Sequence, residues 1–276
     1  MTDERSETFA ELERREWATE TVAAGYAADF ARAADMAVPA LVQGAGAGAG
    51  KAIIDLCCGH GNVTRGLLET GARVTALDFS PAMLALARSN APGAAFIEGD
   101  AMDTGLPAGA FDGVTMGFGM PHVPDPPRTM AEVARLLKPG GRFAFSVWSG
   151  QPEGSAMAYV FKAIGAHGDP AVSLPPGPGA SDYADPARAF PALEAAGFRD
   201  PELIEVASFW EAEEPAAAYL FFLEGTARGG ALLRAQPAER AEAIRQAVVD
   251  AVRAHHGDGP VWTIPMPCVV ISATRG

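Results

Sequence analysis

The chain has 276 residues, of which 49% are hydrophobic and 20% are charged. This composition is typical of a globular protein. The length allows one large domain or two small ones, which can bury enough apolar surface to fold without a structural metal or disulfide bonds. The net charge of −13 argues against a dedicated nucleic-acid-binding protein and against a peripheral protein of anionic membranes, since both normally present a basic surface.

The cysteines and the N-terminal residues suggest a reducing environment. Cys57, Cys58 and Cys268 form neither a CxxC pair nor a zinc-spaced set with histidine. Residues 1–20 are highly charged and lack the apolar centre of a secretory signal. No run of about 18 apolar residues is present. We therefore expect a cytoplasmic protein without a bound metal.

Residues 3–36 carry apolar side chains at an imperfect helical spacing and predict a helix. The stretch "QGAGAGAGK" that follows at 43–51 ends like a phosphate-binding loop. However, Ala45 stands where that loop needs glycine, and Ala52 stands where it needs Ser or Thr. The stretch also precedes a predicted strand instead of following one, so we interpret it as a linker.

Short β-rich segments alternate with helical segments from residue 52 to 148. The strands are predicted at 52–56, 73–77, 94–98, 111–116 and 142–147, and the helices at 63–69, 82–89 and 128–137. Ser80 followed by Pro81 is typical of a helix start. Such alternation predicts a parallel sheet with helices on both faces.

The pattern becomes looser after residue 148. A Pro/Gly-rich loop leads to further predicted elements, namely a helix at 186–198, a strand at 200–210, two or three helices within 215–255 and a strand at about 267–274. The whole chain then predicts an α/β fold.

The stretch "AIIDLCCGHGNVTRGLL" at 52–68 places a glycine bend between the first strand and a helix. Ligands of open α/β sheets bind beyond the carboxyl ends of the strands. Gly59 and Gly61 allow the backbone to approach such a ligand, and the following helix offers free N–H groups. Asp78 ends the second strand about 20 residues further on, where a carboxylate accepts the ribose hydroxyls of an adenosine.

Three details distinguish between adenosine cofactors. A dinucleotide fingerprint needs glycine at position 64, where this chain has Thr64. Asp55 ends the first strand, where a carboxylate repels a pyrophosphate but suits a ligand with an ammonium group. "FIEGDAMD" places Asp100 and Ala101 at the tip of the third strand, where an adenine edge is read.

The stretches "IIDLCCGHG", "VTALDFSPAMLALAR", "FIEGDAMDTGLPAGAFD" and "EVARLLKPGGRFAFSVW" resemble the successive motifs of class I S-adenosylmethionine-dependent methyltransferases. "GFGMPHVPDPPRTMAEVARLLKPGG" is similar to the quinone-biosynthesis branch of that family. The resemblance covers 52–148 well, and 186–207 and 266–274 loosely. It implies a Rossmann-like, seven-stranded, mostly parallel sheet and S-adenosylmethionine as cofactor, with S-adenosylhomocysteine as product. It also implies a small-molecule acceptor methylated at O, N or C, and a monomer or homodimer.

The resemblance also implies roles for the matched positions. They are expected to surround the methionine part of the cofactor (Asp55, Cys57, Gly59, Gly61), hold the ribose (Asp78), pack on sugar and adenine (Phe79, Met83), read the adenine (Asp100, Ala101) and lie near the reacting methyl group (Met116, Gly117). Cys57 stands where the family usually has its first glycine. The paired thiols either pack as small apolar groups or react, and packing is the interpretation we favour.

His122 follows the fourth strand in the loop that faces the reacting methyl group in this family, so it is the candidate general base. A loop histidine that only bonds the backbone is the alternative. We expect a helical lid at 1–43, in which Tyr26 either contacts the cofactor or docks the helix, and a core at 44–207 and 266–276. A helical insertion at 208–265, with an aromatic cluster near Phe222, is expected to cap an apolar acceptor site.

Other functions stay open at this point. An NAD(P)-dependent oxidoreductase is disfavoured by Thr64 and Asp55. A protein that binds the cofactor without turnover would carry the same motifs. The acidic charge disfavours a nucleic-acid methyltransferase, and no feature suggests a peptide groove.

Overall fold

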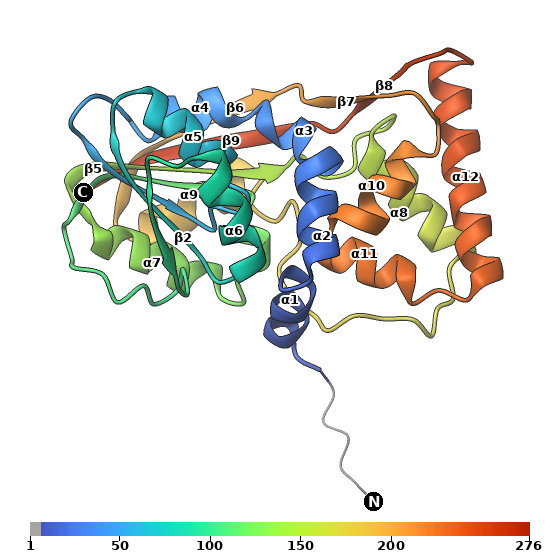
Figure 1. Cartoon of the computed structure of the whole chain (residues 1–276), viewed down its shortest axis with the longest axis horizontal. Coiled ribbons are helices and arrows are strands. Elements are labelled where there is room, and N and C mark those ends of the chain that lie inside the picture. The colour runs from blue at the N-terminus through green and yellow to red at the C-terminus, as the bar shows by residue number, and fades with distance from the viewer. Residues whose placement is uncertain (1–6) are drawn as a thin grey trace, which may run out of the picture.

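A seven-stranded sheet forms one half of the computed structural model, which describes residues 7–276 (Figure 1). The strand order is β3-β2-β1-β4-β5-β9-β6, and within this sheet β9 runs opposite to the other six strands. The strands are β1 Ala52–Leu56, β2 Arg73–Asp78, β3 Ala95–Glu98, β4 Phe111–Gly117, β5 Leu137–Trp148, β6 Phe198–Val206 and β9 Cys268–Arg275. The predicted fold class is confirmed.

The strand order reverses beside β1, which pairs with β2 on one side and with β4 on the other. Connections that leave these strands run in opposite directions. They open a crevice beyond the carboxyl ends of β1 and β4, which is the usual ligand position in open α/β sheets.

Helices cover both faces of the sheet. They are α4 Val38–Gly44, α5 Asn62–Glu69, α6 Pro81–Asn90, α7 Pro126–Leu136 and α9 Pro186–Ala195. Ile53 and Ile54 are adjacent on β1 and belong to different apolar cores, because successive strand side chains point to opposite faces. Ser80 caps α6 as predicted, since its hydroxyl accepts a hydrogen bond from the Met83 N–H.

The predicted N-terminal helix is wrong as a single element. The structure has α1 Phe9–Trp17, α2 Glu20–Gly25, a π-helical turn at Tyr26–Phe30, α3 Ala31–Asp35 and then α4. Residues 3–6 of the prediction lie outside the described residues. Thr8 and Glu11 form a capping box that starts α1, and extended backbone at Thr19 separates α1 from α2.

A second group of helices stands beside the sheet, with α1 and α2 between the two parts (Figure 1). It contains α8 Ala156–His167, α10 Ala217–Gly225, α11 Ala227–Arg234 and α12 Ala238–His256. The three helices after residue 215 agree with the prediction, whereas α8 was not predicted and packs against α12. The expected core of 44–207 therefore includes a helix that belongs spatially to the insertion.

Two paired segments, here called the neck, carry the chain from the sheet into the insertion and back, while residues 149–155 and 168–185 connect α8 to the sheet separately. The predicted strand at 200–210 is two strands, β6 and β7 Phe209–Ala212, and β7 pairs with β8 Trp262–Pro265. Ser208 and Met266 exchange hydrogen bonds where the two strands leave the main sheet: Met266 N–H donates to Ser208 O (2.8 Å), and Ser208 Oγ donates to Met266 O (2.6 Å). The chain thus enters and leaves the insertion side by side.

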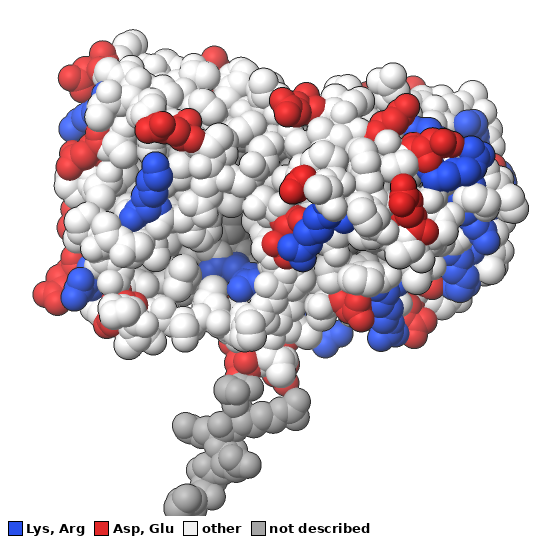
Figure 2. All heavy atoms as spheres, turned by 180° about the vertical axis from the view of Figure 1, so that it is seen from behind, with Lys and Arg blue, Asp and Glu red and all other residues white. Residues whose placement is uncertain are grey.

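Charged side chains of both signs are scattered over the face in Figure 2, without one large basic patch on it. This distribution agrees with the acidic net charge. Among the described helices, none combines the length and the apolar character needed to cross a membrane.

Candidate cofactor and acceptor site

A cavity of about 640 Å³ lies between the sheet and the helical part. This volume lies within the range of small-molecule sites, about 300–1,000 Å³. Loops beyond the carboxyl ends of β1, β2 and β4 form one wall, and the π-helical turn, α8, the 173–181 loop, α10 and α11 supply the other. The cavity therefore occupies the crevice that the reversal of strand order creates.

The glycine bend after β1 lies on this cavity. Gly59 lines it with φ of 53°, and a side chain there would meet no atom within 4 Å. Gly61 caps α5 with φ of 88° and faces α6, where an added Cβ would lie 3.0 Å from the Ala87 Cα. Gly59 thus leaves bare backbone toward a ligand, whereas Gly61 allows the bend to pack on α6.

Cys57, which stands where the resemblance leads us to expect glycine, has a left-handed backbone conformation. Its φ is 53°, in the left-handed region that a side chain disfavours. Cys57 and Cys58 both line the cavity, and burial together with nearby carboxylates raises the pKa of both thiols well above the ordinary value. Protonated thiols are poor nucleophiles, which favours the packing interpretation.

The Asp55 side chain does not line the cavity. Its Oδ2 accepts from Thr64 Oγ1 (2.6 Å) and its Oδ1 from Thr115 Oγ1 (2.8 Å). Complete burial raises the pKa of Asp55 to about 6, although both hydroxyls oppose the shift. The carboxyl group therefore ties β1 to α5 and β4, and the structure does not bring it to the expected cofactor position.

Asp78 lies at the cavity as predicted. Its Oδ2 accepts from the Gly59 N–H and its Oδ1 from the Ser80 N–H, both at 2.9 Å. Burial raises the pKa of Asp78, while these two backbone hydrogen bonds act in the opposite direction. A carboxylate oxygen has two acceptor positions, so each oxygen can still accept a ligand hydroxyl.

The remaining predicted residues divide into two groups. Those on the cavity wall are Tyr26, Cys57, Gly59, Asp78, Phe79, Met83, Gly117 and His122. Those away from it are Asp55, Gly61, Asp100, Ala101 and Met116. Met116 is a residue of β4 whose side chain is buried in the core, and Asp100 accepts from the Met102 N–H (2.8 Å) and faces Arg14 at 3.8 Å.

His122 ends a short 3-10 turn after β4, and α1 supplies its partner. His122 Nδ1 lies 2.9 Å from Glu13 Oε2, which also accepts from the Trp17 indole N–H (3.0 Å). A carboxylate only accepts, so this contact is a hydrogen bond when the imidazole carries its hydrogen on Nδ1. Glu13 was not among the predicted site residues, although its spacing of four residues from Trp17 places both side chains on one face of α1.

The half of the cavity away from the glycine bend is largely apolar. Phe118, which follows β4, stacks on Trp148 of β5 with ring centroids 4.1 Å apart, and Phe161 of α8 and Phe222 of α10 also line the cavity. Arg228 is the one described cationic Lys or Arg on the cavity wall, and it donates to the Pro175 and Pro178 carbonyls. Within the expected cluster, Phe222 reaches the cavity, whereas Tyr219 is buried behind it.

Known proteins resemble the sheet domain most directly. The family of the "Methyltransferase domain" matches residues 54–145. A 2-phytyl-1,4-naphtoquinone methyltransferase of Thermosynechococcus vestitus is 40% identical over 114 residues, which are 39% of this chain and 50% of the relative. A demethylmenaquinone methyltransferase of Thermus thermophilus is 38% identical over 118 residues, 41% of this chain and 53% of the relative. The chain thus spans about half the length of these relatives.

Solved structures share the fold over most of the chain at low identity. The YcgJ protein of Bacillus subtilis aligns with 87% of this chain and 97% of its own, with a TM-score of 0.56 and 17% identity. The [4+2]-cyclase SpnF aligns over 98% and 97%, with a TM-score of 0.58 and 18% identity. Residues 54–145 therefore carry a methyltransferase domain, and the motif order and the fold around it resemble those of the class I S-adenosylmethionine-dependent methyltransferases.

Proposed function

We propose that the protein transfers a methyl group from S-adenosylmethionine to a small, largely apolar acceptor. The observation that carries this proposal is the Gly59–Asp78 pair on a cavity whose other half is aromatic. Asp78 offers a carboxylate for the ribose hydroxyls, and Gly59 exposes its backbone beside it. The aromatic half offers an apolar pocket for the methyl acceptor.

The residues present fit the cofactor. The space next to Gly59 is open, and His60 Nδ1 on the cavity wall is buried without a hydrogen-bond partner among residues 7–276. Phe79 and Met83 provide apolar surface beside Asp78 for an adenosine. When bound, S-adenosylmethionine supplies a methyl group that is activated by its sulfonium.

The protein's contribution to such a transfer is to orient the acceptor, exclude water and accept a proton where the acceptor carries one. Trp17, Tyr26 and Trp148 close the cavity with apolar surface. His122 is the candidate base for a hydroxyl or an acidic carbon, because it lines the cavity and its Nδ1 is already bound to Glu13.

The acceptor half lies largely outside the family match at 54–145. The names of the relatives indicate quinone substrates, which are consistent with an apolar acceptor. They do not identify the acceptor of this protein, because helices α8, α10 and α11 form this part of the cavity wall here. The three unpaired cysteines support a cytoplasmic location, as predicted.

Thermal unfolding with S-adenosylmethionine, S-adenosylhomocysteine, NAD and NADP tests the cofactor. A ligand at about 100 times its Kd stabilises the protein by about 2.7 kcal/mol. We expect only the two adenosyl sulfur compounds to stabilise it, and stabilisation by NAD alone overturns the proposal. A screen of apolar phenols, amines and acidic carbon compounds then tests turnover, and binding without transfer to any of them indicates a non-catalytic binder.

A further inference from the structure

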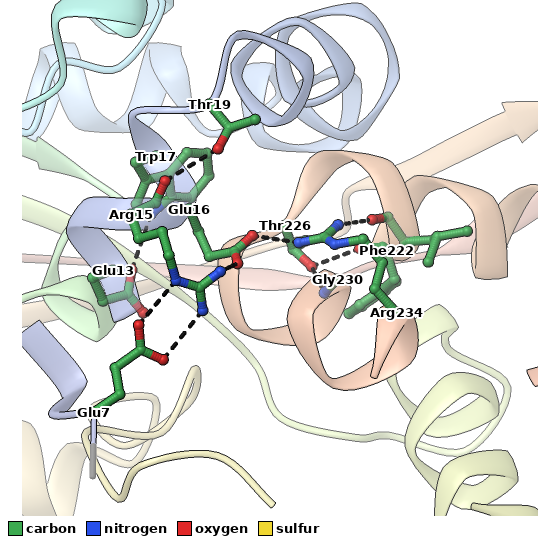
Figure 3. Close-up of polar contacts among 11 residues, drawn as sticks. Glu7, Glu13, Arg15, Glu16, Trp17, Thr19, Phe222, Thr226, Gly230 and Arg234 are labelled. Carbon is green, nitrogen blue, oxygen red and sulfur yellow. Dashed lines mark hydrogen bonds and ion pairs between the residues drawn. The ribbon is translucent and has the colours of Figure 1, made fainter. Parts of the chain in front are cut away.

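Helix α1 contacts both walls of the cavity. On the sheet side, Ser80 Oγ donates to the Trp17 carbonyl (2.6 Å), and Glu13 bonds His122. On the helical side, Glu16 accepts from Arg234 of α11 and from Arg15 (Figure 3). Glu16 is 5% exposed, whereas the Arg234 side chain is 39% exposed, so this ion pair joins α1 to α11 with one partner buried and the other at the surface.

Glu13 is an unusual residue for a short helix that covers a cavity. It is 1% exposed, and its Oε1 has no hydrogen-bond partner among residues 7–276. Burying a carboxylate is costly unless it is fully bonded. An apolar residue would pack at this position without that cost, so stability alone does not explain a carboxylate here.

The hydrogen bonds to Glu13 select one arrangement of the His122 ring. Trp17 Nε1–H donates to Oε2, and this bond fixes the carboxylate between the indole and the imidazole (Figure 3 shows the Trp17 contact). With its hydrogen on Nδ1, His122 has Nε2 as the nitrogen that can accept a proton. The Trp17 ring packs edge-on against the imidazole at 5.3 Å and restricts its rotation.

We propose that Glu13 is a positioning residue, which holds the His122 ring ready to accept a proton at Nε2, and that α1 supplies it only while Glu16 and Arg234 keep α1 in place. This inference rests on the proposed function. During transfer, the acceptor's electron pair forms the bond to the methyl group, the methyl–sulfur pair stays on sulfur, and the acceptor's proton moves to Nε2. The resulting imidazolium is then balanced by the Glu13 carboxylate.

Other charged groups near His122 belong to neighbouring elements. Asp78 at the end of β2 is close enough for the His122 charge to lower its pKa. Arg14, next to Glu13 on α1, pairs with Asp100 at 3.8 Å on a more exposed part of the surface. Glu13 differs from these groups because it alone bonds the ring directly among the described contacts.

The test measures the ring tautomer by NMR of ¹⁵N-histidine protein with and without S-adenosylhomocysteine. His122→Gln identifies the His122 signals. We expect the Nδ1–H form in the wild type and its loss in Glu13→Leu, because the acceptor for Nδ1–H is removed. Glu13→Gln keeps an acceptor and so keeps the tautomer, but it removes the charge.

Two further variants separate positioning from folding. Arg234→Gln leaves the site residues intact and should reduce the Nδ1–H signal by releasing α1. Glu20→Gln removes an exposed carboxylate from the neighbouring α2 and should change nothing. With an acceptor from the screen, kcat of Glu13→Gln should be at least about tenfold lower than that of the wild type, while KM for S-adenosylmethionine should stay unchanged.

The outcomes are distinguishable. Failure of the wild type to bind S-adenosylhomocysteine overturns the proposed function and this inference with it. Binding together with an Nε2–H tautomer in the wild type, or an Nδ1–H tautomer that persists in Glu13→Leu, overturns the role of Glu13 alone.

Discussion

The Gly59 N–H donates to Asp78 Oδ2 across 2.9 Å, so the bend after β1 and the end of β2 form one rigid unit at the cavity. The other oxygen of Asp78 is held by the Ser80 N–H. Both atoms that would face a ribose are therefore fixed before a ligand arrives, which lowers the entropy cost of binding.

Asp78→Ala should weaken S-adenosylhomocysteine binding by about 10- to 100-fold, since each lost bond to a charged group costs about 1.5–3 kcal/mol and 1.4 kcal/mol is tenfold. Isothermal titration calorimetry measures this loss. Glu69→Gln is the control, because Glu69 is an exposed carboxylate at the end of α5 that does not line the cavity. Equal losses in the two variants would contradict the assignment of the ribose site.

Gly119 has no room for a side chain beside Cys57 and Met116. A Cβ at Gly119 would lie 2.6 Å from the Cys57 Cβ and 2.9 Å from the Met116 Cγ and Cε. Gly119→Ala should therefore lower the free energy of unfolding by about 1–3 kcal/mol through overpacking. The double variant with Cys57→Gly should recover part of that loss, because it removes the shortest contact together with the left-handed side chain, while the contacts with Met116 remain. Denaturant unfolding of both variants checks this, and additive losses would refute the coupling.

The buried Asp55 should make folding less favourable as pH rises. Its pKa is about 6 in the folded protein against 3.8 ordinarily. The protonated form is thus favoured by folding, and its contribution is complete below the ordinary value and lost as pH rises toward about 6. At about 1.4 kcal/mol per pH unit, the loss amounts to about 3 kcal/mol.

Asp55→Asn lacks this titration and provides the comparison. The difference in unfolding free energy, wild type minus Asp55→Asn, should fall between pH 4 and pH 7 and then stay constant. Urea unfolding at four pH values measures the difference. A difference that rises over this range would mean that the carboxylate is stabilised by the fold.

Tryptophan fluorescence should separate the two halves of the cavity. Trp17 packs near Phe79 and Met83, whereas Trp148 stacks on Phe118 in the aromatic half. S-adenosylhomocysteine should change the emission of the wild type and of Trp148→Phe, but much less that of Trp17→Phe. An acceptor should show the reverse dependence, and the same response from both variants would mean that the halves are not distinct.

The sheet was predictable because buried parallel strands are continuous apolar runs between turn residues. Helix α8 was not, since residues 156–160 are all buried and no amphipathic period marks it. Asp55 shows a second limit, because spacing places a residue at a strand end but does not say that Thr64 and Thr115 bind its carboxylate. Glu13 and His122 stand 109 positions apart, and no local pattern connects them.

The neck at Ser208 and Met266 has a consequence for how such proteins diversify. The chain departs and returns through two hydrogen-bonded neighbours, so the segment between β7 and β8 is an insertion whose two ends lie side by side. Such an insertion can be lengthened, shortened or exchanged during evolution without breaking a pairing in the main sheet. New acceptor preferences can then arise while the machinery that holds the methyl donor is inherited unchanged.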